Sequence, residues 1–403
     1  MQCTAPHAPQ SSGPLPVSPR SLAAAFAHVP DPRRHASVTY ALAAMLTLAV
    51  AAILANHLSV LAIAEWGARQ SPDVLRTLGF PDGRTPCQST LQRLFSKLDG
   101  HVLAAALSAH FAPPVVPVPE GDAVQGVAVD GKAQRGRLPF QEGGCPVRAL
   151  TAFCHEHSVV LAHEPIAQGA DKGEAEVTVA PALLARVAWP GRVLTGDALF
   201  CQRHLCQQVL DAGGDYLLLV KENQPTLYHD IRLLFDPPPS LAALSLVDQR
   251  EAQTHDRGHG RQDEVRHLVA STDLNDYVAW PGLAQVFRLT RTWREHGQTK
   301  QALRYGITSL RPEAGPPERL LALKRAHWRI ENGLHRVKDV ALGEDQSTIH
   351  RGQGPTVMAL LREAALNLLR RNGVRQISAR LRYHSQQPAA AVALLVAPPP
   401  ADA

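Results

Sequence analysis

The sequence predicts a mixed α/β fold that follows an all-α N-terminal domain. Residues 21–112 repeat apolar side chains at helical spacing. From about residue 123 the pattern changes to three successive strands and then to alternating helices and strands, which is typical of a mixed sheet with helices on both faces. Strand composition returns over about 245–312, and this predicts a β-rich insertion before the last helices.

These patterns divide the chain into five parts. Residues 1–20 lack a charged segment followed by an apolar run, so we expect a disordered tail and no secretory signal. The Pro-rich residues 113–122 are expected to link the helical domain, 21–112, to the α/β domain, 123–372. The Ala- and Pro-rich residues 373–403 are expected to form a C-terminal tail.

Two segments of the helical domain are ambiguous. Tyr40–Ala55 is apolar throughout, but it falls short of the roughly 20 residues that a membrane span requires, and Asn56 follows it. We therefore expect a buried helix. Residues 86–99, PCQSTLQRLFSKLD, fit either the recognition helix of a helix-turn-helix or a plain scaffold helix. The domain is accordingly expected to bind DNA or to mediate assembly.

From residue 123 onward, each element is predicted from period and composition. Strands are expected at 123–130, 147–154, 158–167, 192–199, 215–221, 263–271, 285–295 and 302–310. Helices are expected at 174–188, 201–214, 224–235, 316–338 and 354–372. The polar segment 254–267 is expected to be a hairpin loop or to reach DNA phosphates.

Composition suits a protein of two or three domains. The chain has 403 residues, a net charge of +5 and a pI of about 9.0, a mild basic excess that suits a polyanionic partner without demonstrating one. Its six cysteines form no CxxC pair. We therefore expect free thiols in a cytoplasmic protein, and neither a zinc site nor a disulfide framework.

Three carboxylates stand at positions that suit metal chemistry. Asp130 and Asp197 each end an apolar, strand-like run, and Glu331 lies in the expected helix 316–338. Alone, each has an ordinary explanation: a turn, a helix cap and a solvated helix face, respectively. Together they are the parts of a two-metal phosphoryl-transfer site, in which hard divalent ions are held by carboxylates on rigid elements.

The expected helix around Glu331 carries a polar stripe. Lys324, His327, Glu331, His335 and Lys338 recur every three or four residues. Lys338 follows Glu331 by seven residues, which is almost two helical turns, so both side chains are expected on one face. A zinc site of two histidines and the glutamate is disfavoured, because its outer members would be about 12 Å apart along the helix.

Several blocks resemble a known family. These are VAVDGKAQRG at 127–136, the run from LTGDALF to ENQPTL at 194–227, and HWRIENGLHRVKDVALGEDQS at 327–347, which LLREAALNLLR follows. They are similar to the DDE transposases of bacterial insertion sequences, in the ISAs-type branch that includes the H-repeat-associated proteins. The resemblance covers roughly residues 22–372.

The resemblance implies a ribonuclease-H-like catalytic core with a β insertion before its glutamate. The family's acidic triad carries over to Asp130, Asp197 and Glu331. It implies two Mg²⁺ ions, for which Mn²⁺ can substitute, one between the two aspartates and one between Asp130 and Glu331. The implied reaction is DNA cleavage and strand transfer, by a homodimer or larger assembly, on terminal inverted repeats and target DNA. A transposition-inactive DNA-binding protein and a general ribonuclease-H-like nuclease are the alternatives.

The family pattern also suggests DNA contacts. It places Tyr and Arg before the glutamate and Lys seven residues after it; here Lys324 and His327 replace the first two, and Lys338 matches the third. The expected DNA contacts are Lys132, Arg135, Lys221, Asn223, Gln224, Arg325, His327 and Lys338. Solvated loops, or a loop that leads into a helix, are the alternative for most of these. Trp328 is expected to be a core residue in preference to a base-stacking one.

Overall fold

The structure is a computed structural model. It describes residues 15–34, 38–112, 124–134, 148–166, 172–239, 247–258, 261–295 and 298–398. The expected linker, 113–122, lies outside these residues, as do Arg135 and most of the expected N-terminal tail.

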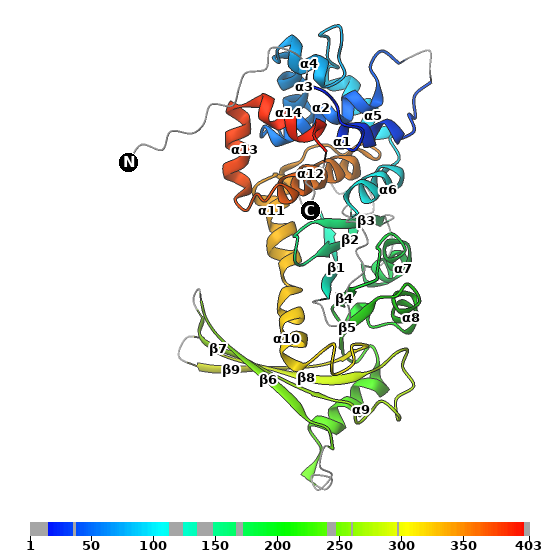
Figure 1. Cartoon of the computed structure of the whole chain (residues 1–403), viewed down its shortest axis with the longest axis vertical. Coiled ribbons are helices and arrows are strands. Elements are labelled where there is room, and N and C mark those ends of the chain that lie inside the picture. The colour runs from blue at the N-terminus through cyan, green and yellow to red at the C-terminus, as the bar shows by residue number, and fades with distance from the viewer. Residues whose placement is uncertain are drawn as a thin grey trace. The chain divides into compact units, whose positions relative to one another are not determined.

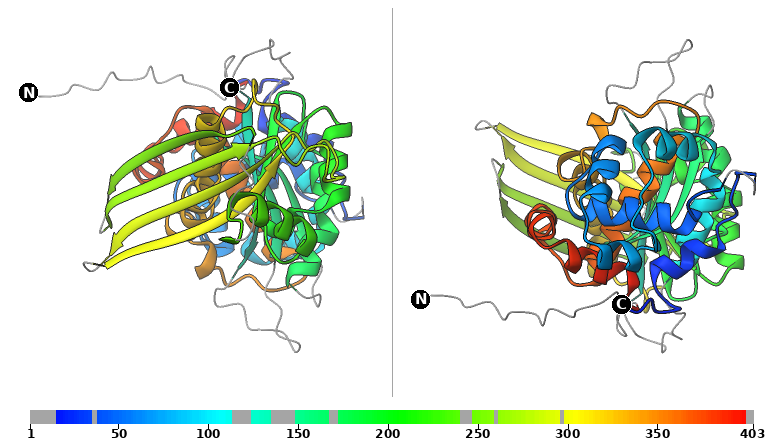
Figure 2. Two further views of the ribbon diagram at one scale, coloured as in Figure 1. Left: turned by 90° about the horizontal axis from the view of Figure 1, so that it is seen from below. Right: turned by 90° about the horizontal axis from the view of Figure 1, so that it is seen from above.

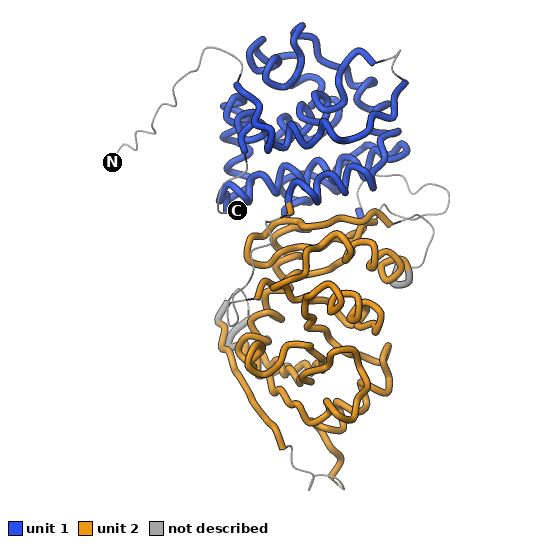
Figure 3. The backbone as a smooth tube through the Cα atoms, turned by 45° about the vertical axis from the view of Figure 1, so that its right-hand side comes forward, with its two compact units in different colours: residues 1–111, 134–147, 336–403 blue, residues 112–133, 148–335 orange. Residues whose placement is uncertain are grey.

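The chain forms two compact units. Unit 1 contains residues 1–111, 134–147 and 336–403, and unit 2 contains residues 112–133 and 148–335 (Figure 3). The second unit holds the sheet, and the first is helical in its described part.

Unit 1 is built around a buried hydrophobic helix. This helix, α2 (Leu42–Leu54), has almost every residue buried, which explains why its sequence is apolar on all sides. Helices of the N-terminal region and of the C-terminal region both pack against it. None of the helices in the described part of the chain is long and apolar enough to cross a membrane. The other helices of unit 1 are α1 (Leu22–Ala25), α3 (Val60–Ala68), α4 (Pro72–Thr77), α5 (Gln88–Lys97), α6 (Gly100–Phe111), α11 (Arg336–Val340), α12 (Gly354–Arg371), α13 (Ile377–Gln386) and α14 (Pro388–Val396).

The C-terminal region differs from the prediction of a tail. Gly373, with a φ of +72°, follows the end of α12, and two further helices, α13 and α14, come after it. The apolar face of α14 is buried against α1 and α2. The expected domain boundary at residue 372 is also displaced, since α12 packs with the N-terminal helices α2, α5 and α6 in unit 1.

Unit 2 contains a nine-stranded sheet in the order β3-β2-β1-β4-β5-β9-β8-β7-β6 (Figure 1). Strand β2 is antiparallel to both of its neighbours, β1 and β3; β1, β4 and β5 are parallel, and β9 is antiparallel to β5. The strands are β1 (Gln125–Ala133), β2 (Arg148–Cys154), β3 (Val160–Ile166), β4 (Arg192–Gly196), β5 (Asp215–Val220), β6 (Arg250–Gly258), β7 (Arg261–Ser271), β8 (Gln285–Glu295) and β9 (Gln298–Thr308).

Helices cover both faces of this sheet, as the sequence predicts. On one face, α7 (Lys172–Leu184), α8 (Arg203–Asp211) and α9 (Pro225–Phe235) supply a core with inward residues of β1, β4 and β5. On the other face lies α10 (Pro317–Ala326), which contacts β5, β6 and β7, and its Leu320 and Leu323 share a second core with the alternate residues of the strands. Strands that are buried on both faces are continuously apolar, which is why β5 reads DYLLLV.

The β-rich insertion continues the same sheet. Strands β6 to β9 form an antiparallel meander, with its long strands side by side (Figure 2). The sequence predicts three of the four. Strand β6 was expected to belong to a polar loop, because it contains little apolar sequence; it pairs with β7 from Arg250 opposite Ala270 to Gly258 opposite Arg261.

The single helix expected at 316–338 is interrupted. Helix α10 ends at Ala326, a turn comes next at His327 and Trp328, and Glu331–His335 form a π-helical turn before α11. A π turn adds a residue to the helical ladder, so it rotates the helical segment after it relative to the segment before it. The interruption changes which side chains share a face.

Candidate metal centre

Asp130 lies in β1 just beyond its paired stretch with β4, and Asp197 directly follows β4, the adjacent parallel strand. Ala128 of β1 is level with Thr195 of β4. Asp130 and Asp197 each come two residues later, so the register carries them to the same level of the sheet edge. Neighbouring strands are about 4.8 Å apart. The fold thus brings together two residues that are 67 positions apart in the sequence.

Asp197 is also a helix cap, as its simpler explanation suggests. Its Oδ1 accepts a hydrogen bond of 3.0 Å from the backbone N–H of Leu199, at the start of a short 3₁₀ turn (Ala198–Phe200). The residue is exposed. Capping uses one carboxylate oxygen, and the second has lone pairs of its own to offer an ion.

The loop that follows β5 holds the loop of Asp197 in place. Asn223 Nδ2 donates to the carbonyl of Ala198 at 2.7 Å, and Gln224 Nε2 donates to the carbonyl of Cys201 at 3.0 Å. Both amides were expected to contact DNA. In this structure they bond to backbone instead, and they fix the segment that carries Asp197.

Glu331 comes close to Asp130 through the π-helical turn. One ligand atom from each of Asp130, Glu331 and His335 lies within 4.8 Å of the other two. His335 Nε2 is 3.3 Å from Asp130 Oδ2, and the histidine is only 4 % exposed. Asp197 is not part of this group of three.

His335 was missed as a site residue. The sequence offers its i+4 spacing from Glu331, but that spacing was considered only together with His327 as a zinc set. His327 does not join the group; Asp130 does. Since Asp130 is more than 200 residues earlier in the chain, no local pattern identifies it as the third member.

His327 is tied to the strand that carries Asp197. Its Nδ1 lies 3.1 Å from the Thr195 hydroxyl, which is 3.1 Å from His155 Nε2 and donates to the carbonyl of Val127 at 3.3 Å. A hydroxyl that donates its single proton keeps two lone pairs, so this network assigns an N–H to each facing imidazole nitrogen. Burial, reinforced by Lys324 and Arg329, lowers the pKa of His155 to about 3, and burial likewise lowers that of His327. Both rings are therefore neutral, and His327 is a packing and positioning group here, in contrast to its expected DNA contact.

Lys324 is buried close to Asp197. It is 7 % exposed, and burial lowers its pKa to about 8, although the negative charge of Asp197 opposes the shift. The nearby positive charges of Lys221 and Arg304, both exposed, lower it further. Lys324 thus feels the charge of Asp197 and those of two exposed cationic side chains.

Lys338 was expected to contact a phosphate, but in unit 1 it belongs to a buried ion cluster. Its Nζ lies 2.6 Å from Glu363 and 3.0 Å from Glu344, and the residue is 4 % exposed. Burial would lower the pKa of Lys338, but the two carboxylates raise it above its usual value. Glu331 is exposed, whereas Lys338 is buried, and the π turn at Glu331–His335 replaces the regular α-helical spacing on which the predicted shared face rested.

Of the other expected DNA contacts, one is simply exposed and two interact with groups of the protein. Lys221 is exposed at the end of β5. Arg325 is exposed but pairs with Asp256 at 2.8 Å, and Lys132 Nζ donates to the backbone carbonyl of His335 at 3.2 Å. Trp328 is 65 % exposed, so the expectation of a core residue is wrong. It lies in the turn that separates α10 from the π-helical segment, where few neighbours pack.

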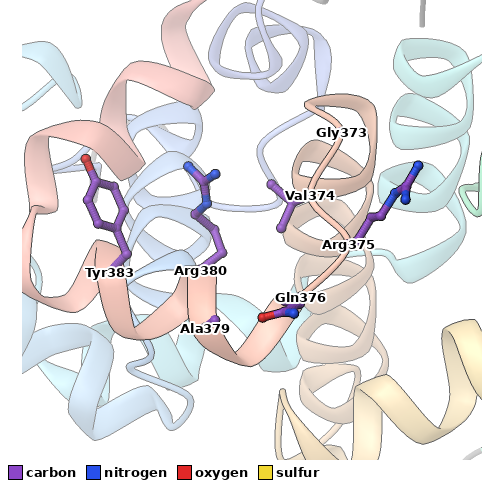
Figure 4. Close-up of a pocket in the computed structure, with 7 residues that line it drawn as sticks. All are labelled: Gly373, Val374, Arg375, Gln376, Ala379, Arg380 and Tyr383. Atoms are coloured by element: carbon purple, nitrogen blue, oxygen red, sulfur yellow. The ribbon is translucent and has the colours of Figure 1, made fainter. Parts of the chain in front are cut away.

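Unit 1 has an open pocket with a different character. It is bounded by the start of α13 and the turn before it (Figure 4). The lining residues are Gly373, Val374, Arg375, Gln376, Ala379, Arg380 and Tyr383. None of them is a carboxylate, histidine or cysteine, so the pocket offers neither metal ligands nor a strong nucleophile.

Comparison with known proteins agrees with this geometry. Residues 125–368 match the family model described as "Transposase DDE domain", and residues 23–111 match one described as "DDE_Tnp_1-associated". "Putative transposase YncI" of Escherichia coli O157:H7 is 29% identical over 88% of both chains. "H repeat-associated putative transposase YhhI" of Escherichia coli K12 is 26% identical over 85% of this chain and 88% of its own.

A solved structure, the piggyBac transposase synaptic complex with hairpin DNA, aligns with 93% of this chain and 77% of its own, with a TM-score of 0.39 and 11% identity. That likeness is too weak to support conclusions about the fold. The match to the DDE model, in contrast, spans more than half of the chain and includes Asp130, Asp197 and Glu331. The chain belongs to the transposase DDE domain family.

Proposed function

We propose that this protein is a transposase that uses divalent metal ions to cleave and rejoin DNA at the ends of an insertion sequence. The observation that carries the proposal is the level position of Asp130 and Asp197 on adjacent strands, with Glu331 brought to Asp130 by the π turn. The order and directions of the first five strands suit a ribonuclease-H-like core. Family membership makes DNA the expected substrate.

The donor set fits Mg²⁺. Asp130, Asp197 and Glu331 offer carboxylate oxygens, which hard divalent cations prefer. Asp197 and Glu331 are exposed and the Asp130 side chain is 39% exposed, so a phosphodiester can approach the group. When bound, the ions supply Lewis-acid stabilisation of charge on the phosphoryl oxygens and activate a water or a DNA 3′-hydroxyl.

The remaining residues of the site position these carboxylates. Asn223 and Gln224 hold the Asp197 loop, and the neutral pair His155 and His327 anchors Thr195, two residues before Asp197. Rigid support of this kind holds the ligands in a productive geometry. No nucleophilic side chain is required by this reaction.

Phosphate contacts are proposed on the cationic side of Asp197. Lys221 and Arg304 are exposed there, with Lys324 buried behind them. Guanidinium and ammonium groups neutralise DNA phosphates without reading sequence. We place the DNA backbone next to the scissile bond on this surface, with terminal inverted repeats and target DNA as substrates, and we propose a homodimer or larger assembly on the DNA.

A panel of substrates tests the proposal. Purified protein with Mg²⁺ is incubated with a duplex that carries the element's terminal repeat, an unrelated duplex of equal length, and an RNA–DNA hybrid. We expect cleavage at the repeat boundary and little cleavage of the other two. Equal cleavage of all three would indicate a general nuclease, and cleavage of none would indicate a DNA-binding protein without this chemistry.

A further inference from the structure

His335 is a buried imidazole that points into the carboxylate group. Its Nε2 lies 3.3 Å from Asp130 Oδ2, and its side chain is 6% exposed. Its Nδ1 has no hydrogen-bond partner among the described residues. The directed polar contact of this ring is therefore made through Nε2, toward Asp130.

We propose that His335 is a ligand of the divalent ion held by Asp130 and Glu331, so that this half of the site is a mixed nitrogen–oxygen site. The inference rests on the proposed function, which assigns metal to these carboxylates. It adds a neutral nitrogen ligand to the acidic triad.

The distances suit a shared ion. Metal–oxygen and metal–nitrogen bonds of about 2.0–2.2 Å place neighbouring ligand atoms roughly 3 Å apart and opposite ones roughly 4 Å apart. The Nε2–Oδ2 separation of 3.3 Å fits a neighbouring pair. The ligand atoms of Asp130, Glu331 and His335 all lie within 4.8 Å of one another. This limit exceeds the spacing of opposite ligands by less than 1 Å. Small rotations of the exposed Glu331 side chain can close that difference.

The local fold holds His335 ready for this role. Glu331 and His335 are the first and last residues of the π-helical turn, and π turns are frequent at functional sites. Lys132 donates to the His335 carbonyl at 3.2 Å, which ties the end of the turn to β1 just beyond Asp130. Leu334 is fully buried beside it. Because the imidazole is already enclosed, ligation costs little side-chain freedom.

A nitrogen ligand has a chemical consequence. Imidazole suits later transition metals better than it suits Mg²⁺, whereas carboxylates suit Mg²⁺ and Mn²⁺. Loss of His335 should therefore weaken binding of Co²⁺ more than binding of Mg²⁺. It should also remove any nitrogen from the coordination sphere of the bound ion.

Pulsed electron paramagnetic resonance of Mn²⁺ bound to the full-length protein tests this directly. We expect ¹⁴N modulation from a coordinated imidazole in the wild type. We expect its loss in His335→Gln, with Mn²⁺ affinity weakened about tenfold or more, in the range seen when groups that support a metal site are removed. His204→Gln, which changes an exposed histidine of α8, is the matched control and should keep both properties.

The outcomes distinguish a failure of the proposed metal site from a failure of His335 as its ligand. If Mn²⁺ binds the wild type and is lost in Asp130→Asn, but no ¹⁴N modulation is seen, the metal site stands and His335 is not a ligand. If Mn²⁺ does not bind, or binds equally well to Asp130→Asn, the metal site itself is overturned. Should His335→Gln fail to fold, [¹⁵N]histidine labelling of the wild type serves instead: a ¹⁴N pattern replaced by a ¹⁵N one supports a histidine ligand, and an unchanged pattern excludes it.

Discussion

At the scale of single residues, the position of the Asp197 carboxylate depends on uncharged side chains next to the end of β4. Thr195 connects two strands and two imidazoles through one hydroxyl, because it donates to Val127 and faces His155 and His327. Gly126 allows this packing, since a β-carbon there would overlap the His155 ring. Thus His327 contacts β4 through the Thr195 side chain, two residues before Asp197.

Thr195→Val tests this network. The substitution keeps the shape but leaves two buried imidazole N–H groups without their acceptor, so we expect a loss of about 1–3 kcal/mol in the free energy of unfolding. Urea denaturation followed by circular dichroism measures it. Thr299→Val, at an exposed position of β9, is the control and should change stability by less than about 0.5 kcal/mol. Equal effects of the two substitutions would contradict the network.

The pKa of His155 gives the network a pH dependence. Its pKa is about 3 in the folded protein, below its usual value of 6.5, so between these values the unfolded chain binds the proton more readily. The neutral ring therefore stabilises the fold fully above pH 6.5, and this contribution is lost as the pH falls toward 3.

We expect the free energy of unfolding to fall below pH 6.5, by at most about 1.4 kcal/mol per pH unit for this group. His155→Gln removes the titrating ring and should flatten that part of the profile. Denaturation at a series of pH values measures both slopes. A slope unchanged by the substitution would show that His155 does not titrate in this window.

At the scale of elements, the segment after the insertion shows what the sequence can and cannot predict. The apolar stripe of 316–338 correctly predicts α10, because Leu320 and Leu323 pack on the sheet. The spacing of apolar residues does not predict the π turn. A π turn inserts one residue into the helix, and it uses the same kinds of residue as an α-helix. The burial of Lys338 results from that difference and from two carboxylates at 344 and 363, which local periodicity does not relate to it.

Lys338→Met distinguishes a structural role from a DNA contact. Removing the ammonium takes away the charge that Lys338 supplies to buried Glu344 and Glu363, and we expect a loss of about 3–5 kcal/mol in stability. Thermal or urea unfolding measures it. Lys97→Met removes an exposed lysine of α5 and should cost little. A stable Lys338→Met protein with weakened DNA binding would restore the phosphate-contact role.

At the scale of the whole molecule, the sequence predicts most strands along the chain better than the boundaries of the units. Asp130 and Asp197 stand out in the sequence because each directly follows a buried apolar run, although β1 itself continues past Asp130 to Ala133. The C-terminal helices and strand β6 are harder to predict, because Ala-rich and polar sequences have weak periodicity. The compact units mix distant parts of the chain, since α12 joins the N-terminal helices.

The net charge of +5 and the exposed cations beside Asp197 predict salt-sensitive DNA binding. Each phosphate contact contributes roughly −0.9 to the slope of log affinity against log salt concentration. Lys221→Ala and Arg304→Ala should each reduce the magnitude of the slope by about one. Lys300→Ala, on an exposed lysine paired with Glu295, is the control. Affinities that do not change with salt would place DNA elsewhere.

The central claim is that the acidic triad of unit 2 cleaves DNA. Its most direct test is Mg²⁺-dependent cleavage of terminal-repeat DNA by the wild type, by Asp197→Asn and by Asp230→Asn, which changes a partly buried aspartate of α9 outside the site. Asparagine preserves shape and can still accept the cap hydrogen bond from Leu199, so Asp197→Asn should fold and bind DNA. We expect it to lose cleavage by at least about a hundredfold, the scale of removing one preorganised electrostatic group, with Asp230→Asn near wild type. Cleavage by Asp197→Asn at the wild-type rate would contradict the account.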